Sequence, residues 1–333
     1  MNRKKKIKIK SWKKFILSLF VIIALIAGTA FGSTLYQLSK IETKKISKTD
    51  DDLGIKHKET KEGTEDSNVT NIALFGVDRR DKDEPARSDS IMILTIDEKN
   101  KKIKMSSIMR DTYVKVAGHG ETKINHAYAY GGPELAIKTL NENFDLDIRN
   151  YATVDFFNLE KIIDAVGGVN VDVNDDEVSL INSYMNETAT IEKKSITKIP
   201  SSGSQTLNGM QSVAYTRIRY TAGGDFVRTE RQRTILSGIF TKIESLGAKE
   251  FPSVVSKLLP LTETSMNSMD IIKLGSKVFS SNIRTLDQER FPLDGYCNDE
   301  MIDGVSYLVA DMEATVDQLH KYIYEDIKPG SNN

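Results

Sequence analysis

Nineteen residues of the chain hold an unusual concentration of arginine. The stretch YTRIRYTAGGDFVRTERQR, Tyr215 to Arg233, contains five arginines and two carboxylates. The whole chain has 46 lysines and arginines, of which only 13 are arginines. A planar guanidinium group can donate two hydrogen bonds to one phosphate, which the ammonium group of lysine cannot do. The local choice of arginine therefore indicates a site for an anion such as phosphate.

A strand and a helix are expected to present these arginines. The segment AYTRIRY alternates in a strand-like pattern, which places Arg217 and Arg219 on one strand face. Asp225 is a suitable N-cap for a helix that carries Arg228 and two further arginines in its first turns. Cations are disfavoured there by roughly a few tenths of a kcal/mol each, because the helix dipole is positive at that end. An anion bound between strand and helix explains the arrangement, and a solvated charged face is the alternative.

A second group of charges lies in the loop GVDRRDKDEPARSDS. Asp78 follows one expected strand and Asp89 precedes the next. Such a pair suits a hard divalent cation, Mg²⁺ or Mn²⁺, because Mg²⁺ commonly binds one or two carboxylates together with phosphate oxygens. Arg80 and Arg87 lie in the same loop, and Arg110 follows a later strand end in SSIMRDTY. Taken alone, this loop is a weak signal, and loop-capping aspartates with surface ion pairs are the favoured interpretation.

Other catalytic signatures are missing from the sequence. His119 and His126 are not at metal-ligand spacing with each other or with Cys297, and there is no serine elbow, P-loop or zinc motif. The single cysteine cannot form an internal disulfide bond, which fits an outward-facing domain with a sufficient core. Asp111 and Asp225 are candidates to accept a proton or, more simply, to orient arginines.

The patterns around these motifs predict an α/β fold with a mixed central β-sheet flanked by helices. Apolar runs predict strands, and helical spacing predicts a long helix from Asp225 to about Leu246. Ser179 to Ser204 is polar and lacks a clear period, so an insertion is expected there. The expected strands are NIALFGVD, SIMILTID, KIKMSSIM, YATVDF, VNVDV, NIRTLDQERFPL and GVSYLVA; the other expected helices are GPELAIKTLNENF, NLEKIIDAV, Met269 to Ser280 and Met312 to Tyr324.

The N-terminus is typical of a signal anchor. MNRKKKIKIKSWKK carries eight basic residues and no acid, and about twenty uncharged residues follow, enough to span a bilayer. Basic residues before a span hold that side in the cytoplasm, so the rest of the chain is expected outside the cell. A signal peptide cleaved near Gly28 to Ala30 is the alternative. The predicted parts are a cytoplasmic tail (1–14), a transmembrane anchor (15–36), an extracellular linker (37–68) and a catalytic domain (69–333).

The motifs occur together in one order and resemble the LytR-CpsA-Psr family. The resemblance rests on GVDRRDKDEPARSDSIMILT, SSIMRDTY, KINHAYAYGGPE, VDFFNLEKIIDAVGGVNVDV, LNGMQSVAYTRIRY and GDFVRTERQR, within residues 71–236. It implies a membrane-anchored transferase of cell-wall glycopolymers, such as teichoic acid or capsular polysaccharide. Such an enzyme moves the glycan with its phosphate from a polyprenyl-pyrophosphate carrier to peptidoglycan and releases polyprenyl phosphate.

The resemblance also assigns roles to residues. Asp78 and Asp89 match the magnesium-binding acids. The expected pyrophosphate-binding residues are Arg80, Arg87, Arg110, Arg217, Arg219, Arg228 and Gln232, and the expected catalytic group is Arg110, Arg217, Arg219, Asp225 and Arg228. Arg231 and Arg233 are expected to support the site or face solvent. The family often has proline where this chain has Met109 and glycine where it has Val227, which affects local backbone geometry and removes no charge.

Two other function classes compete with transfer. One is a scaffold that binds polyprenyl pyrophosphate, or a pyrophosphatase that hydrolyses it. The other is a membrane-bound transcriptional attenuator, but a positive-inside anchor places the arginines outside the cell, away from nucleic acid. The basic N-terminus is therefore interpreted as a topology signal and not as a nucleic-acid site.

Overall fold

The computed structural model describes residues 43–56, 68–79 and 86–330. The expected tail and transmembrane anchor, part of the linker, and Arg80 lie outside the described residues. None of the helices within the described ranges is both long and apolar enough to cross a membrane. The described residues belong to one compact unit, Thr43–Asn333.

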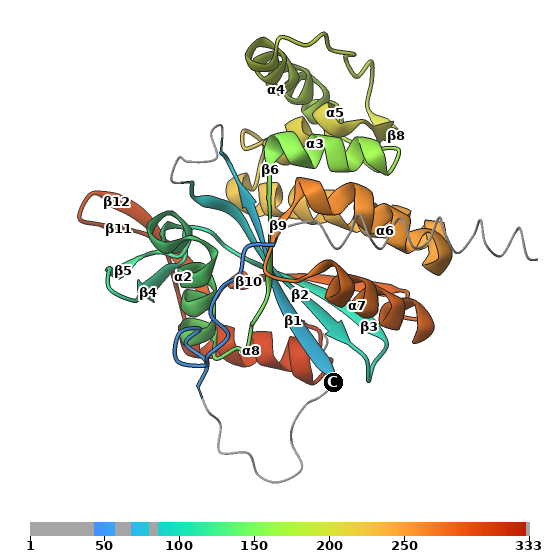
Figure 1. Ribbon diagram of the computed structural model, residues 1–333. Helices are drawn as coiled ribbons and strands as arrows, with labels where there is room; N and C mark the ends of the chain where they lie inside the picture. The colour runs from blue at the N-terminus through green and yellow to red at the C-terminus, as the bar shows by residue number, and fades with distance from the viewer. Residues whose placement is uncertain (1–42, 57–67, 80–85, 331–333) are drawn as a thin grey trace, which may run out of the picture. The chain divides into compact units, whose positions relative to one another are not determined.

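A mixed six-stranded sheet forms the centre of this unit, as Figure 1 shows. The two strands on either side of β2 run antiparallel to it, whereas β6 is parallel to β1 and β10 is parallel to β3. The carboxyl ends of β1, β3, β6 and β10 therefore share one edge of the sheet. In spatial order the strands are β10 (Thr285–Phe291), β3 (Lys102–Ile108), β2 (Ser88–Asp97), β1 (Val69–Val77), β6 (Tyr151–Asp155) and β9 (Glu263–Thr264).

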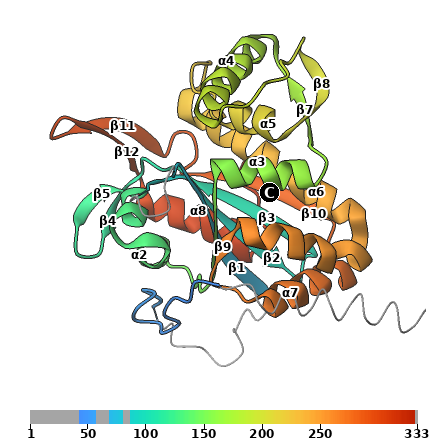
Figure 2. The same ribbon diagram turned by 45° about the horizontal axis from the view of Figure 1, so that its top comes forward.

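Each face of the sheet is covered by its own pair of helices (Figures 1 and 2). Side chains alternate along β1, so Ala73 and Phe75 join the core cluster that includes residues of α2 and α8. Ile72 and Leu74 point to the opposite face, where residues of α6 and α7 lie. The bounds of these helices are α2 His126–Phe144, α8 Met312–Tyr324, α6 Gly224–Leu258 and α7 Ser268–Ser280.

A second core lies between α6 and a group of shorter elements. Ile163, Val171, Ile181, Leu207 and Ile235 are buried together in it. It supports the first turns of α6, from which several predicted site residues project. The shorter elements are α3 (Phe156–Ala165), β7 (Val169–Val173), α4 (Asp175–Glu192), β8 (Gly203–Leu207) and α5 (Gly209–Thr216).

Two hairpins flank the carboxyl-end edge of the sheet. In the first, Tyr113 pairs directly with Lys123 across the two strands. The second is attached to the chain after β3 by a bridge between Thr112 and Leu308 and by the hydrogen bond from Leu308 N to Asp111 O at 2.9 Å. The hairpins are β4 (Tyr113–Val116) with β5 (Gly120–Lys123), and β11 (Cys297–Ile302) with β12 (Val305–Ala310).

The predicted α/β class and mixed sheet are confirmed, but two local predictions are wrong. The segment around Arg217 is not a strand, because a capping box of Asn208 and Gln211 starts helix α5, which ends at Thr216. Ser179 to Ser204, where an insertion is expected, contains most of helix α4 and the start of strand β8. Asp225 is not the N-cap of α6: Gly223 takes that position with a left-handed φ of 89°, and Asp225 lies in the first turn.

Candidate active site

The site begins at the ends of β1 and β2. Gly76 pairs with Ser90, but Val77 pairs with Ser88, so Asp89 is the extra residue of a β-bulge. Bulges redirect a side chain at the end of a strand pair and are common next to active sites. The Asp89 carboxylate accepts a hydrogen bond from Arg110 Nη1, which comes from the end of β3.

Arg110 connects three carboxylates. Besides its bond to Asp89, its Nη2 lies 3.4 Å from Asp225 Oδ1 and its Nε lies 3.7 Å from Asp111 Oδ2. Burial alone would lower the pKa of the guanidinium, but the negative charges of the three carboxylates, Asp225 most of all, outweigh burial and raise it. Arg110 is therefore a fixed positive charge held by its neighbours from three directions.

Helix α6 brings a second arginine to the same place. Arg228 is only 2% exposed. Its Nη2 donates a hydrogen bond of 3.2 Å to the main-chain oxygen of Asp89, and its Nε lies 2.9 Å from Asp225 Oδ1 at an angle unsuited to a hydrogen bond. Burial lowers the pKa of Arg228 to about 10; Asp225 opposes this shift, while Arg110 and Arg219 add to it. The group still carries its charge at neutral pH.

The two arginines and Asp225 form a charged centre whose hydrogen bonds are incomplete within the described part of the chain. Both oxygens of Asp225 are buried and accept no hydrogen bond from the described part of the chain. Buried charges are stable only when they are paired and hydrogen-bonded. The buried Nε atoms of Arg110 and Arg228 also make no hydrogen bond within the described residues. A ligand with anionic acceptor oxygens and a hydroxyl or water donor would complete the hydrogen bonds of Arg110, Arg228 and Asp225.

The charged centre continues toward the surface through Lys123, a residue that is not among the predicted site residues. Lys123 Nζ lies 2.8 Å from Asp111 Oδ1, and Asp111 in turn contacts Arg110. Lys123 is at the end of β5, far from the arginine-rich stretch in sequence. Its position in KINHAYAY gave no direct signal, because the register of the β4–β5 hairpin was not predicted.

The other predicted residues are distributed around this centre. Arg217 turns to helix α4, where its guanidinium lies 3.4 Å from Glu187 Oε2 and 5.0 Å from the ring centroid of Tyr184. Arg219 is exposed in the loop after α5, close enough to Arg228 to affect its pKa. Arg87 is exposed and Gln232 is buried, and Arg80 lies outside the described residues.

Arg231 has a supporting position, and Arg233 follows it on the same helix. Arg231 is buried and forms an ion pair of 2.6 Å with Glu177 of α4. It also donates hydrogen bonds to Ile218 O at 3.2 Å and Thr221 Oγ1 at 2.8 Å, which fixes the loop that carries Arg219. Burial lowers the pKa of Arg233, which lies partly buried near Glu230.

The acidic residues of the site fit a metal ion that arrives together with a bound anion better than they fit a metal ion held by the protein alone. Asp78 is exposed just after β1, and Asp89 stands in the bulge of the adjacent strand. Across the described ranges, no group of three or more acidic, histidine or cysteine side chains is arranged to hold a metal. Two carboxylates completed by phosphate oxygens and water are a set that Mg²⁺ commonly uses.

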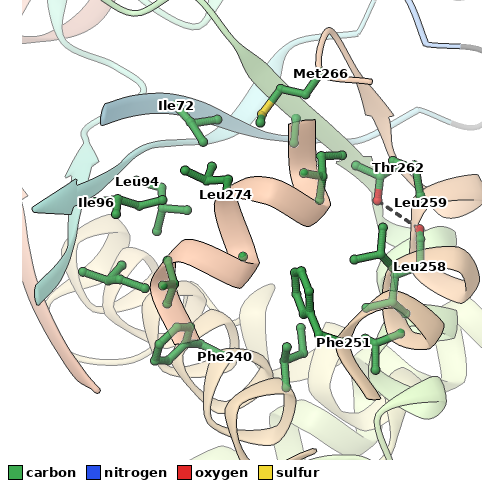
Figure 3. Close-up of a pocket in the computed structure, with 18 of the residues that line it drawn as sticks. Ile72, Leu94, Ile96, Phe240, Phe251, Leu258, Leu259, Thr262, Met266 and Leu274 are labelled. Carbon is green, nitrogen blue, oxygen red and sulfur yellow. Dashed lines mark hydrogen bonds between the residues drawn. The ribbon is translucent and has the colours of Figure 1, made fainter. Parts of the chain in front are cut away.

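An apolar pocket opens between the sheet and the two helices of the α6–α7 face. Its cavity volume is about 330 Å³. Figure 3 shows Ile72, Leu94 and Ile96 of the sheet opposite Phe240, Phe251 and Leu274 of the helices. Glu244, Thr262 and Thr264 are the polar residues among its lining. The sequence motifs did not delimit this pocket, because its walls come from ordinary core-like residues of β1, β2, β3, β6, α6, α7 and the segment between the two helices.

The chain was compared with known proteins. The model of the LytR_cpsA_psr family matches residues 34–322. Polyisoprenyl-teichoic acid–peptidoglycan teichoic acid transferase TagT of Bacillus subtilis (strain 168) is 32% identical over 253 residues, 74% of this chain and 75% of that protein. The transferase of the same kind named TagU, from Bacillus cereus (strain ATCC 14579), is 29% identical over 309 residues, 90% of this chain and 92% of that protein.

Solved structures of the same group have the same fold. The crystal structure of B. subtilis TagT matches with a TM-score of 0.62 and 25% identity, covering 86% of this chain and 99% of that one. YwtF (TagT) with bound octaprenyl pyrophosphate lipid matches with a TM-score of 0.57 and 26% identity, covering 77% and 91%. With the family model matching most of its length, the chain belongs to the LytR-CpsA-Psr family.

Proposed function

We propose that this protein is a phosphotransferase that attaches a glycopolymer to peptidoglycan. It takes the polymer with its phosphate from a polyprenyl-pyrophosphate carrier and releases polyprenyl phosphate. The names of the relatives TagT and TagU favour wall teichoic acid as the polymer, with capsular-type polysaccharide as the other candidate.

One observation carries this proposal: helix α6 joins the charged centre to the apolar pocket. Arg228 belongs to the centre and Phe240 lines the pocket, twelve residues further along the same helix. At 1.5 Å per residue this separation is roughly 18 Å. A molecule with an anionic head and a long apolar tail can place the head at Arg110 and Arg228 and the tail between the sheet and α7. The relative solved with octaprenyl pyrophosphate bound a molecule of this kind.

The chemistry asked of the site is phosphoryl transfer. A hydroxyl oxygen of the acceptor sugar forms a bond to the glycan-side phosphorus, and the bond from this phosphorus to the bridging oxygen breaks. Polyprenyl phosphate leaves with the electron pair and takes up the proton released by the hydroxyl. Arg110 and Arg228 stabilise the charge that develops on the phosphate oxygens, since positioning and charge stabilisation dominate this reaction class. Asp225 orients both guanidinium groups.

A magnesium ion belongs to the same proposal. Asp78 and Asp89 are the residues that would hold it, and it would supply further charge neutralisation at the pyrophosphate. Arg87, Arg219 and Gln232 stay proposed as outer contacts of the donor, together with Arg80. Arg217, engaged with α4, is proposed to act by supporting the loop that follows it.

We further propose that the domain lies outside the cell, anchored by residues 15–36 with the N-terminus in the cytoplasm. Protease added to intact cells is expected to digest the domain. Protection until the cells are lysed would contradict this orientation and favour the attenuator hypothesis.

The function is tested with a lipid-linked donor that carries a labelled glycan. We expect label to move to peptidoglycan only when donor, acceptor and wild-type protein are all present. Arg228→Lys keeps the charge but loses the contacts to Asp225 and to the Asp89 main chain, so transfer is expected to fall by about 10²-fold. Arg149→Lys is the matched control, because Arg149 is 43% exposed and pairs with Asp50 at the surface.

The same assay separates the competing activities. Release of polyprenyl phosphate without acceptor would identify a pyrophosphatase. Binding of the donor with neither transfer nor release would identify a scaffold. Either outcome in the wild-type protein contradicts the proposed transfer.

A further inference from the structure

A line of charges leads from the buried centre to an aromatic pair at the surface. Arg110 contacts Asp111, and Asp111 contacts Lys123 at 2.8 Å. Lys123 Nζ lies 5.8 Å from the ring centroid of Tyr307. The mechanism described above gives these aromatic residues no role.

Tyr113 and Tyr307 form this aromatic pair from two separate hairpins. Their ring centroids are 4.8 Å apart at an interplanar angle of 62°, and both residues are partly exposed. Tyr113 lies opposite Lys123 on the β4–β5 hairpin, and Tyr307 lies on β12, which Leu308 N joins to Asp111 O. The backbone connections therefore hold both rings next to the end of the charged line.

The aromatic pair and the apolar pocket lie on opposite sides of the sheet. Val114 and Val116 of β4 pack in the core cluster with Phe75 and Ala127, on the α2 face. The pocket lies on the α6–α7 face, lined by Ile72 and its neighbours. Figures 1 and 2 both show the two hairpins on the side of the sheet away from α7.

This arrangement matters for the direction of attack. In phosphoryl transfer, the attacking and leaving oxygens are roughly in line on opposite sides of the phosphorus. The proposed leaving group, polyprenyl phosphate, has its tail in the pocket. The attacking sugar must then approach from the side of β4, β5 and β12.

We propose that Tyr113 and Tyr307 form the platform on which the glycan strand of the peptidoglycan acceptor lies. Pyranose rings have apolar C–H faces and polar rims, which match a tyrosine ring beside a charged Lys123–Asp111 pair. This inference rests on the proposed transfer. It assigns an acceptor-binding role to two residues outside the arginine centre.

The test measures acceptor and donor binding separately. The probes are a β-1,4-linked N-acetylglucosamine oligosaccharide and inorganic pyrophosphate with Mg²⁺, each titrated into the full-length protein. Tyr307→Ala is expected to weaken oligosaccharide binding by about tenfold and to raise the acceptor KM similarly. Tyr307→Phe keeps the ring, so its oligosaccharide affinity is expected to stay within about twofold. Pyrophosphate affinity should be unchanged in both variants.

Tyr296→Ala is the control, because Tyr296 is 41% exposed just before β11 and is not part of the pair. Unchanged oligosaccharide binding in Tyr307→Ala and Tyr113→Ala would overturn the inference, as would an equal loss of pyrophosphate binding. Normal transfer with an unchanged acceptor KM in Tyr307→Ala would reject the platform inference and leave the proposed function intact. Tyr307-dependent oligosaccharide binding without any transfer would keep the platform and reject the proposed function.

Discussion

At the scale of single residues, the site depends on the shape of arginine as much as on its charge. Arg110 reaches Asp89, Asp111 and Asp225 through three different nitrogens. An ammonium group is one point on a flexible stem and cannot hold three carboxylates in this fixed arrangement. Arg231 of the arginine-rich stretch likewise contacts Glu177, Ile218 O and Thr221 through three different nitrogens, so multiple directed contacts explain the choice of arginine there better than net charge does.

Arg110→Lys is therefore expected to damage catalysis more than donor binding. The charge that attracts the donor stays, but the oriented contacts that stabilise the transition state are lost. We expect kcat for glycan transfer to fall by about 10²- to 10³-fold while the donor KM changes little. Steady-state transfer kinetics check this. A rise in KM with an unchanged kcat would show that Arg110 contributes only to ground-state binding.

At the scale of elements, helix α6 positions the charged centre, and helix α4 fixes the loop that precedes α6. The ion pair of Arg231 and Glu177 is buried, with side-chain exposures of 4% and 2%. Its guanidinium also binds Ile218 O and Thr221 Oγ1 in the loop between α5 and α6. The first turn of α4 thus fixes the loop that carries Arg219.

Arg231→Lys is expected to loosen this loop, because lysine cannot make the three contacts together. Hydrogen exchange should become faster in residues 217–223 and stay unchanged in β1 and β2. Transfer should fall, and the effect should be larger on the donor KM than on kcat, since the loop holds proposed outer contacts. Unchanged exchange in the loop would contradict this positioning role. Arg149→Lys again serves as the surface control.

A second buried pair fastens helix α8 to the sheet. Lys104 is 0% exposed, and its Nζ lies 2.7 Å from Asp97 Oδ2 and donates a hydrogen bond to Ile323 O at 2.9 Å. Burial opposes ionisation of Asp97, but hydrogen bonds from Lys104 and Asn100 outweigh it and lower its pKa. A carboxyl whose pKa is lower in the folded state stabilises the fold above its unfolded pKa. That stability is lost as the pH falls through the folded pKa.

Asp97→Asn removes the buried carboxylate partner of Lys104 and leaves only the partly exposed Asp326, whose Oδ1 lies 3.2 Å from Lys104 Nζ, so it is expected to cost about 3 kcal/mol of unfolding free energy at neutral pH. The difference from wild type should shrink as the pH falls below about 4, where the wild-type carboxyl is protonated in the unfolded chain. Denaturant unfolding at several pH values measures both effects. Lys321→Met, which removes an exposed i,i+4 pair with Asp317, should cost at most about 0.5 kcal/mol. Equal costs in the two variants would contradict the prediction.

At the scale of the whole molecule, the sheet separates two environments that the reaction needs together. One face carries the apolar pocket and the other carries the hairpins, while the charged centre lies at the strand ends between them. A bulky side chain in the pocket should affect the lipid without disturbing the charged centre. Leu94 on β2 lines the pocket and is labelled in Figure 3.

Leu94→Trp is expected to raise the KM for a donor with a long polyprenyl chain by about tenfold or more, since the cavity loses part of its volume. The KM for a short-chain donor should change much less. Lys257→Trp is the matched control, because Lys257 is exposed beside the lining residue Leu258. Equal effects on long-chain and short-chain donors would show that the tail does not lie in this pocket.

Much of the fold could be predicted where local sequence and tertiary packing agree. The strands β1, β2, β3 and β6 lie within a few residues of their apolar runs, and helix α8 has the predicted bounds Met312–Tyr324. The strand predicted for AYTRIRY is wrong because its alternating pattern is short and the capping box of Asn208 and Gln211 starts a helix just upstream. Pairings between Arg110, Asp89, Asp225 and Lys123 join four separate segments, so no local pattern could report them.

The sequence by itself determined the chemical inventory: arginines and aspartates in ordered motifs, an α/β pattern and a family. These features are local, since residue type, spacing and periodicity can be read without knowing what folds against what. Only the tertiary structure decided that Arg228 is buried against Asp89 while Arg217 turns to α4. It also placed Lys123 at Asp111 and built a pocket from scattered apolar residues. Side chains distant in sequence become neighbours through strand register and helix packing, which depend on the whole chain at once.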